Sequence, residues 1–172
     1  MSTISRKCLI VPAVAILALV YAGSVSSAYQ EEGYQPAGAW AWTITSMQGS
    51  PMGPALVTLH HNGTVSVSAA SMFNPGKGYL SPGHGVWERT GPMSFGGTTL
   101  YMRYDQYGSV AGFMRACTAL QFAGDPDHIE GLMYVERCDG CTDPLGPDVI
   151  WKGPGIPVFV LGTRIQRVEV PE

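Results

Sequence analysis

The sequence has few charged side chains, and cations are especially scarce. Charged residues make up 13% of its 172 residues, about half the usual share of a soluble protein, and the formal net charge is −3. Beyond Lys7, the lysines are Lys77 and Lys152, and no basic cluster surrounds them. A chain without a basic patch lacks the electrostatic footprint that nucleic acids and anionic membrane surfaces require. We therefore expect neither as a partner.

Signatures of catalysis and of metal binding are also missing. There is no Gly-x-Ser-x-Gly nucleophile motif, no phosphate-binding loop and no dinucleotide fingerprint. His60 and His61 are neighbours, so on a strand they point to opposite faces and do not chelate one ion together. No His-x-His or Cys/His ligand set exists. We expect no metal ion and no cofactor.

No apolar run is long enough to cross a bilayer, which takes roughly 20 residues. The longest, from Cys8 to Ala22, is interrupted by Pro12, follows Arg6 and Lys7, and precedes small residues that end at Ala28. This is the layout of a secretory signal peptide. We expect residues 1–28 to be cleaved, which predicts a secreted or periplasmic protein with no membrane span; an uncleaved anchor is the alternative.

The remaining 144 residues (172 minus 28) fit one domain. The removed segment holds two of the ten basic residues and no acidic ones, so 8 positive and 13 negative groups remain, a formal charge of −5. Residues 29–37 have no periodicity and are expected to form a flexible leader. A single domain is predicted over residues 38–172.

Cysteines are few. Cys117, Cys138 and Cys141 follow the signal peptide, and an oxidising compartment favours one disulfide among them. The spacing of Cys138 and Cys141 makes them the candidate pair. Acidic residues and prolines, namely Asp139, Asp143, Pro144 and Pro147, flank the pair, so a loop-tightening disulfide, or two unreactive thiols, is favoured over redox catalysis.

Turn-forming residues are abundant, with 22 glycines and 13 prolines. Between them, apolar residues alternate with small or polar ones in short runs, which is the period of half-buried strands. No helical period persists for three turns. The predicted strands are Ala39 to Ser46, Ala55 to His61, Thr64 to Ala70, His84 to Thr90, Met93 to Asp105, Val110 to Ala123, His128 to Arg137 and Val158 to Val168.

Short connections predict that consecutive strands pair in antiparallel fashion. Asn62-Gly63 is the signal of a two-residue hairpin. Eight strands suffice to close a sheet, and closure removes its exposed edges. The fold class is therefore an all-β, eight-stranded, antiparallel up-and-down barrel. Two longer connections, Ser71 to Gly83 and Asp139 to Pro157, are candidates for binding loops or for covers packed over a barrel end.

Two motifs resemble those of a known superfamily. Gly38-Ala39-Trp40 on the first strand resembles the Gly-x-Trp of the calycins and their lipocalins, in which an arginine beyond the last strand covers the Trp at the closed barrel end. The resemblance implies this role for Trp40 with Arg164 or Arg167. The segment Ser81 to Gly91, followed by Phe95 and Thr98, resembles a block in small bacterial lipocalin-like proteins of unassigned function.

His84 is the most distinctive polar candidate, because glycines on both sides leave its imidazole uncrowded. His84, Val86 and Glu88 share one face of their strand. If that face were inward, His84 and Glu88 would form an acid/base pair for an enzyme. A histidine at the barrel rim, bonded to a turn, is the alternative.

Aromatic residues mark a candidate lining. Trp40 and Trp42 share a face with Ile44, and Tyr101 shares a face with Arg103. An inward Arg103 would offer a fork for a ligand carboxylate, whereas an outward one would reach into solvent. We predict ligand-binding roles for Trp40, Trp42, His84, Tyr101 and Arg103, with Met114, Met133 and Val135 as further interior candidates.

An eight-stranded barrel either fills its interior or holds one small ligand. We therefore expect a binding protein for a small, mainly apolar molecule. One alternative is a cofactor-independent isomerase or cyclase that acts on a hydrophobic substrate through His84 and Glu88. Another is a structural or interaction protein with a filled barrel, which contacts an unknown protein partner through Asp139 to Pro157.

Overall fold

The computed structural model describes residues 34–70, 73–74, 78–153, 155 and 157–166. All the secondary structure assigned to them is β, apart from turns and one helical residue. The strands are β1 (Gly38–Ser46), β2 (Pro51–Leu59), β3 (Thr64–Ala69), β4 (Phe73–Asn74), β5 (Gly78–Leu80), β6 (Gly83–Arg89), β7 (Ser94–Tyr104), β8 (Val110–Phe122), β9 (His128–Asp139) and β10 (Val158–Arg164).

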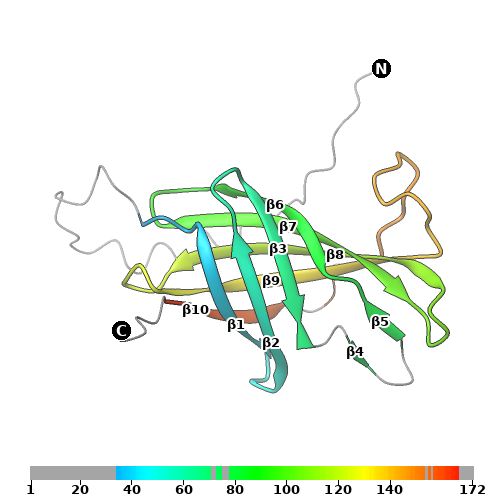
Figure 1. The fold of residues 1–172 in the computed structure, drawn as a ribbon, viewed down its shortest axis with the longest axis horizontal. Coiled ribbons are helices and arrows are strands. Elements are labelled where there is room, and N and C mark those ends of the chain that lie inside the picture. Colours follow the sequence, from blue (N-terminus) through cyan, green and yellow to red (C-terminus); the bar gives the residue numbers. More distant parts are fainter. Residues whose placement is uncertain (1–33, 71–72, 75–77, 154, 156, 167–172) are drawn as a thin grey trace, which may run out of the picture. The chain divides into compact units, whose positions relative to one another are not determined.

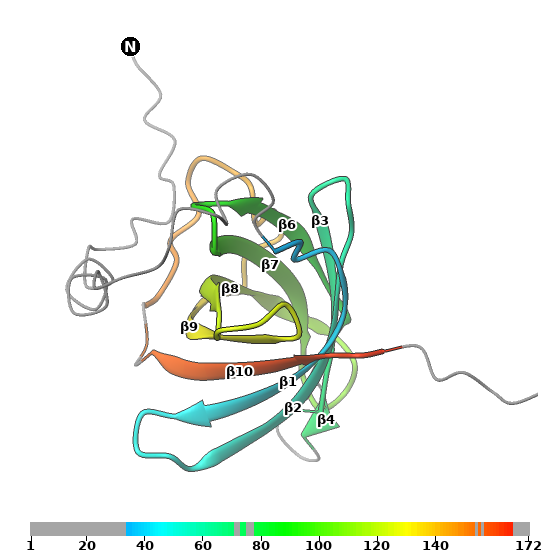
Figure 2. The same ribbon diagram turned by 90° about the vertical axis from the view of Figure 1, so that its left-hand side faces the viewer.

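Eight of these strands close into an up-and-down barrel (Figures 1 and 2). Around the ring the order is β1, β2, β3, β6, β7, β8, β9, β10, and β10 pairs back with β1; every pairing is antiparallel. This confirms the predicted fold class and is consistent with a calycin-like fold. The remaining strands, β4 and β5, extend the sheet beside the end of β7, where Tyr79 pairs with Tyr104.

All eight predicted strands are present, with shifted ends. β2 begins at Pro51 because its ladder with β1 continues past a bulge at Ile44/Thr45. The β2–β3 hairpin is longer than expected: His60 N donates to Thr64 O, so the loop holds residues 61–63, and Gly63 adopts a φ of 81° there. The predicted long connection 71–83 contains β4 and β5.

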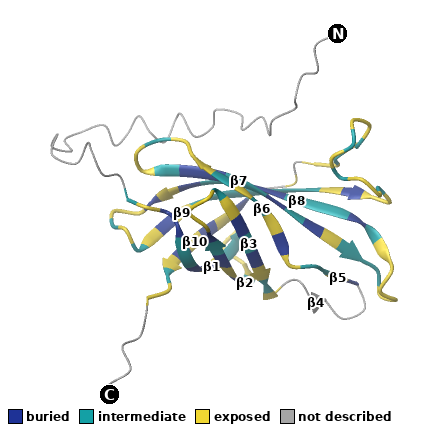
Figure 3. Cartoon of the chain, turned by 45° about the horizontal axis from the view of Figure 1, so that its top comes forward, coloured by how far each residue is buried: buried dark blue, intermediate teal, exposed yellow. Residues whose placement is uncertain are grey.

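Side chains alternate between the barrel interior and its surface, as the burial colours along the strands show (Figure 3). One end of the interior is filled by large apolar side chains. Trp40, Phe95 and Ile129 are each at most 2% exposed, and Phe122 packs against both Trp40 and Phe95. Dense packing of this kind supplies most of the hydrophobic stabilisation of a small barrel.

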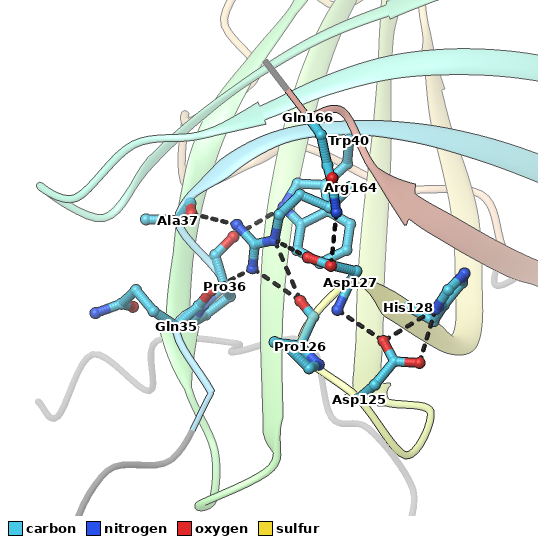
Figure 4. A network of polar contacts seen from close by, with 10 residues as sticks. All are labelled: Gln35, Pro36, Ala37, Trp40, Asp125, Pro126, Asp127, His128, Arg164 and Gln166. Atoms are coloured by element: carbon cyan, nitrogen blue, oxygen red, sulfur yellow. Dashed lines mark hydrogen bonds and ion pairs between the residues drawn. The ribbon is translucent and has the colours of Figure 1, made fainter. Parts of the chain in front are cut away.

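Arg164 covers this filled end, as the resemblance implied (Figure 4). Its guanidinium lies 4.3 Å from the centroid of the Trp40 ring and forms an ion pair with Asp127 at 3.1 Å. Arg167, the alternative, lies outside the described residues. The segment before β1 also joins this end: Trp40 Nε1 donates to Pro36 O at 2.8 Å, and Tyr34 packs edge-on against Phe122. Residues 34–37, expected in the flexible leader, thus pack against the barrel, whereas 29–33 lie outside the described residues.

Candidate functional site

The opposite half of the barrel is not completely filled. It contains a cavity of about 50 Å³ with a predominantly apolar lining, to which six of the eight ring strands and β5 contribute. The lining residues are Trp42, Ile44, Ala55, Val67, Ala69, Leu80, Tyr101, Met114, Ala116, Met133 and Val135. A space of this size admits the end of an apolar chain but not a whole ligand, since ligand pockets usually measure about 300–1,000 Å³.

Tyr101 is held against the cavity by a glycine on the next strand. A Cβ on Gly83 would lie 2.4 Å from Tyr101 Cε1, so the ring occupies the space that a side chain on β6 would fill. Tyr101 is 7% exposed, and burial raises the pKa of its hydroxyl from 10.0 to about 12. The hydroxyl has no hydrogen-bond partner among the described residues. It is therefore a neutral donor and acceptor bordering an apolar cavity.

Trp42 has a similar neighbour. A Cβ on Gly162 of β10 would lie 2.9 Å from Trp42 Cδ1, so this glycine makes room for the indole. Trp42 is 6% exposed, and its Nε1 is buried without an acceptor in the part of the chain that the structure describes. Buried donors are normally satisfied by protein, water or ligand. The cavity is thus bordered by two aromatic residues with unused hydrogen-bonding capacity.

A larger, open cleft of about 530 Å³ adjoins the cavity at the barrel mouth. The two share Met114 and Val135. Other lining residues of the cleft are Arg103, Glu136, Arg137, Lys152, Gly153 and Gly155. Its volume is within the usual range for a small-molecule site.

The strand register sets the order of side chains from the mouth inward. In β7, β8 and β9 the outermost inward-facing row is Arg103, Gly112 and Asp139, and the next row is Tyr101, Met114 and Arg137. Because Gly112 has no side chain, Arg103 and Asp139 form an ion pair across it. Polar groups therefore occupy the rim, and the row below combines Arg137 with the first apolar groups, the Tyr101 ring and Met114.

Asp139 is the centre of the charges at the mouth. It accepts a hydrogen bond from Arg103 and one from Lys152 Nζ at 3.0 Å, and Arg137 Nε lies 3.6 Å away. The hydrogen bonds from Arg103 and then Lys152 lower the pKa of the Asp139 carboxyl to about 2. Three cations thus surround one carboxylate.

The other carboxylate at the cleft is already neutralised. Glu136 Oε2 accepts hydrogen bonds from Arg115 Nε, at 2.7 Å, and from its Nη2. Arg115 also lies 4.4 Å from the centroid of the Trp151 ring, which belongs to the β9–β10 connection. Arg115 is therefore paired with Glu136 rather than directed freely into solvent. This ion pair leaves a local excess of positive charge around Asp139.

The β9–β10 connection is anchored to the mouth. Cys138 and Cys141 form a disulfide on either side of Asp139 and Gly140. Further along, Arg137 and Lys152 exchange backbone hydrogen bonds of 3.1 and 2.8 Å, which extends the sheet beside β9. These links position Lys152 over Asp139 although 13 residues separate them in sequence.

The predicted ligand-binding residues are divided among four places, one of which is the outer face of β6, where His84 is exposed. Trp42 and Tyr101 line the cavity, and Arg103 lines the cleft. Trp40 is fully buried at the filled end and does not contribute to either space. Their roles in binding stay predictions.

His84 and Glu88 require a correction. Both are exposed, on the outer face of β6 beside Val86, which is 61% exposed. The inward face of this strand carries Gly83, Gly85 and Trp87. His84 and Glu88 therefore do not form an acid/base pair in the barrel interior. The odd-numbered residues of this strand face inward, and the even-numbered ones, which include both candidates, face outward.

The sequence did not single out Arg137, Asp139 or Lys152. Alternation from Met133 and Val135 along β9 could have placed Arg137 and Asp139 on the inward face. Lys152 lies in a proline-rich connection without periodicity, so no sequence signal links it to β9.

Within the described residues, no group of three or more histidine, cysteine, aspartate or glutamate side chains is arranged to hold a metal ion. A helix long and apolar enough to span a membrane is likewise not found in the described part of the chain.

No protein-family model matches this chain. A search of curated proteins also found no match.

Proposed function

We propose that this protein is an exported, lipocalin-like barrel that binds a small, mainly apolar molecule. The observation that carries the proposal is the apolar cavity beside Trp42 and Tyr101, next to an open cleft with which it shares Met114 and Val135. The cleft accommodates the body of a ligand and the cavity accommodates its apolar end. Burial of such an end contributes about 25 cal/mol for each Å² removed from water.

Export is part of the proposal and rests on two observations. Residues 1–28 have the layout of a signal peptide. The Cys138–Cys141 disulfide is compatible with an oxidising compartment. Expression in a bacterium, followed by the intact mass of the periplasmic protein, tests this: a chain beginning at residue 29 is expected, and retention of the full chain in the cytoplasm would contradict export.

Binding is tested with the neutral apolar fluorophore N-phenyl-1-naphthylamine. The purified protein is expected to increase its fluorescence saturably. Ala116→Leu and Ala69→Leu each place extra carbons in the cavity and should weaken binding at least about tenfold, because the apolar end loses its space. Ala41→Leu, on the exposed face of β1, is the matched control and should bind like the wild type.

Circular dichroism establishes that each variant is folded before its affinity is compared. Absence of saturable fluorescence with the wild-type protein would contradict the proposal. So would equal affinity of all three variants, since the fluorophore would then bind elsewhere.

The residues that suggested an isomerase or cyclase do not face the barrel interior. His84 and Glu88 are on the outer surface. Tyr101 is the ionisable side chain that lines the cavity, and its raised pKa keeps it neutral at physiological pH. A neutral phenol donates hydrogen bonds but is a poor general base.

One observation favours the interaction alternative as a second candidate. Leu145 and Ile150, in the β9–β10 connection, are 80% and 79% exposed. Large apolar side chains this exposed are common where another protein binds. If this connection is an interaction site, a protein should co-purify stoichiometrically with the native chain and be lost from the Leu145→Ser/Ile150→Ser double variant; retention in that variant would exclude the site.

A further inference from the structure

We propose that the ligand is an apolar carboxylic acid, whose carboxylate binds Arg103, Arg137 and Lys152 in the position that the Asp139 carboxylate occupies in this structure. This inference rests on the proposed function and specifies the class of ligand. It assigns Asp139 the role of an internal competitor for the ligand head.

The local charge supports an anionic head. Arg103, Arg137 and Lys152 converge on Asp139 from β7, β9 and the β9–β10 connection. With Glu136 paired to Arg115, the rim has an excess of two positive charges, although the chain as a whole is acidic. A focused positive potential at a cleft attracts anions from solution.

The geometry already accommodates a carboxylate. Asp139 accepts hydrogen bonds from both Arg103 and Lys152, and guanidinium groups match carboxylates through parallel N–H donors. The side chains of Arg103 and Asp139 are 28% and 37% exposed, so an incoming carboxylate reaches the pair without unfolding the barrel. A ligand carboxylate therefore replaces an existing contact of the same chemistry.

The rows below the rim match an apolar tail. One row deeper, roughly 7 Å along the strands, are Tyr101 and Met114, and the next row contains Ala116 and Val135. All four line the cavity. A head at Arg103 thus directs the attached chain past Tyr101 into the apolar space.

The test compares decanoate with decanol, which share one apolar chain and differ in the head. Both displace N-phenyl-1-naphthylamine from the wild-type protein below micelle-forming concentrations, and decanoate is expected to bind about five to ten times more tightly. Arg103→Gln should remove most of that preference without changing the affinity for decanol. Asp139→Asn should strengthen decanoate binding several-fold, because it removes the competing carboxylate. It should not change the affinity for decanol.

Arg89→Gln is the charge-matched control, since Arg89 contacts the backbone of Pro92 and Tyr34 and does not line the cleft. It should retain the full preference for decanoate. Lys152→Gln is a second rim variant in case Arg103→Gln does not fold, and it should also reduce the preference.

Failure of this inference is distinguishable from failure of the proposed function. Two results would contradict acid binding at the rim but not the proposed apolar site. In one, the fluorophore and decanol bind while decanoate binds no more tightly than decanol; in the other, Asp139→Asn leaves the decanoate affinity unchanged. If the fluorophore, decanol and decanoate all fail to bind, the proposed function is overturned and the inference with it.

Discussion

The guanidinium of Arg164 stacks on the ring of Trp40, 4.3 Å from its centroid, and fastens the last strand of the barrel to the segment before the first (Figure 4). Its Nη1 donates to Ala37 O at 2.9 Å, and its Nη2 donates to Gln35 O at 2.6 Å and to Pro126 O at 3.0 Å. One side chain therefore satisfies three backbone carbonyls from two segments and covers the filled end.

Replacement of Arg164 by Gln should destabilise the protein by about 2–4 kcal/mol, because it removes a cation–π contact and several charge-assisted hydrogen bonds. The free energy of unfolding is measured by urea denaturation. Arg137→Gln, at a side chain that is 62% exposed, is the control and should change stability by less than about 0.5 kcal/mol. Equal stability of the two variants would show that Arg164 does not secure this end.

The small size of Gly83 allows the position of Tyr101. Gly83→Ala should displace the Tyr101 ring, destabilise the barrel by about 1–3 kcal/mol and weaken fluorophore binding, because the new Cβ would lie 2.4 Å from Cε1. At Gly155 a Cβ would meet its nearest neighbour at 3.6 Å, so Gly155→Ala should leave stability unchanged. Unfolding by urea and the fluorophore titration measure the two effects; unaltered binding in Gly83→Ala would mean that the Tyr101 position is unimportant.

The alternation of apolar and polar residues predicted the barrel well. A strand that faces solvent on one side and the core on the other repeats its side-chain pattern every two residues. The alternation predicted the inward phase correctly on β1 and β7, where Trp40, Trp42 and Tyr101 are large. On β6 the alternation left the inward face open. The inward positions include Gly83, whose space is occupied by the Tyr101 ring of the neighbouring strand, so Trp87 is the large apolar side chain that marks the inward face.

The cleft was beyond prediction for a different reason. The pair Arg103–Asp139 depends on the register of three strands and on Gly112 between them. Lys152 reaches Asp139 only through the path of the β9–β10 connection. Neither register nor loop path is encoded in a local pattern of residues.

The Asp139 carboxyl should titrate with a midpoint near pH 2, well below the ordinary 3.8, because Arg103 and Lys152 stabilise its charged form. A lowered pKa in the folded protein means that this ion pair contributes to stability above about pH 4 and is lost as the pH falls toward 2. Carboxyl-carbon NMR measures the midpoint, which should rise in Arg103→Gln. A midpoint near 3.8 in the wild type would show that the contacts are not maintained in solution.

Tyr101 should resist ionisation up to about pH 12, because its buried hydroxyl is costly to charge. In the unfolded chain it ionises near 10, so the folded state should lose stability as the pH rises from about 10 to 12. Tyrosinate absorbance during alkaline titration, with circular dichroism to report folding, should contain one late step that Tyr101→Phe removes. Simultaneous ionisation of every tyrosine in the folded protein would contradict burial of this hydroxyl.

The most direct test of ligand binding within the barrel uses the methionine methyl groups in NMR spectra. Met114 and Met133 line the cavity, whereas Met47, Met52 and Met93 are exposed at other places and are internal controls. On titration with decanoate, the account predicts saturable shifts of the Met114 and Met133 methyl resonances while the three control resonances stay in place. Shifts confined to the exposed methionines, or none at all, would show that the barrel interior does not hold the ligand.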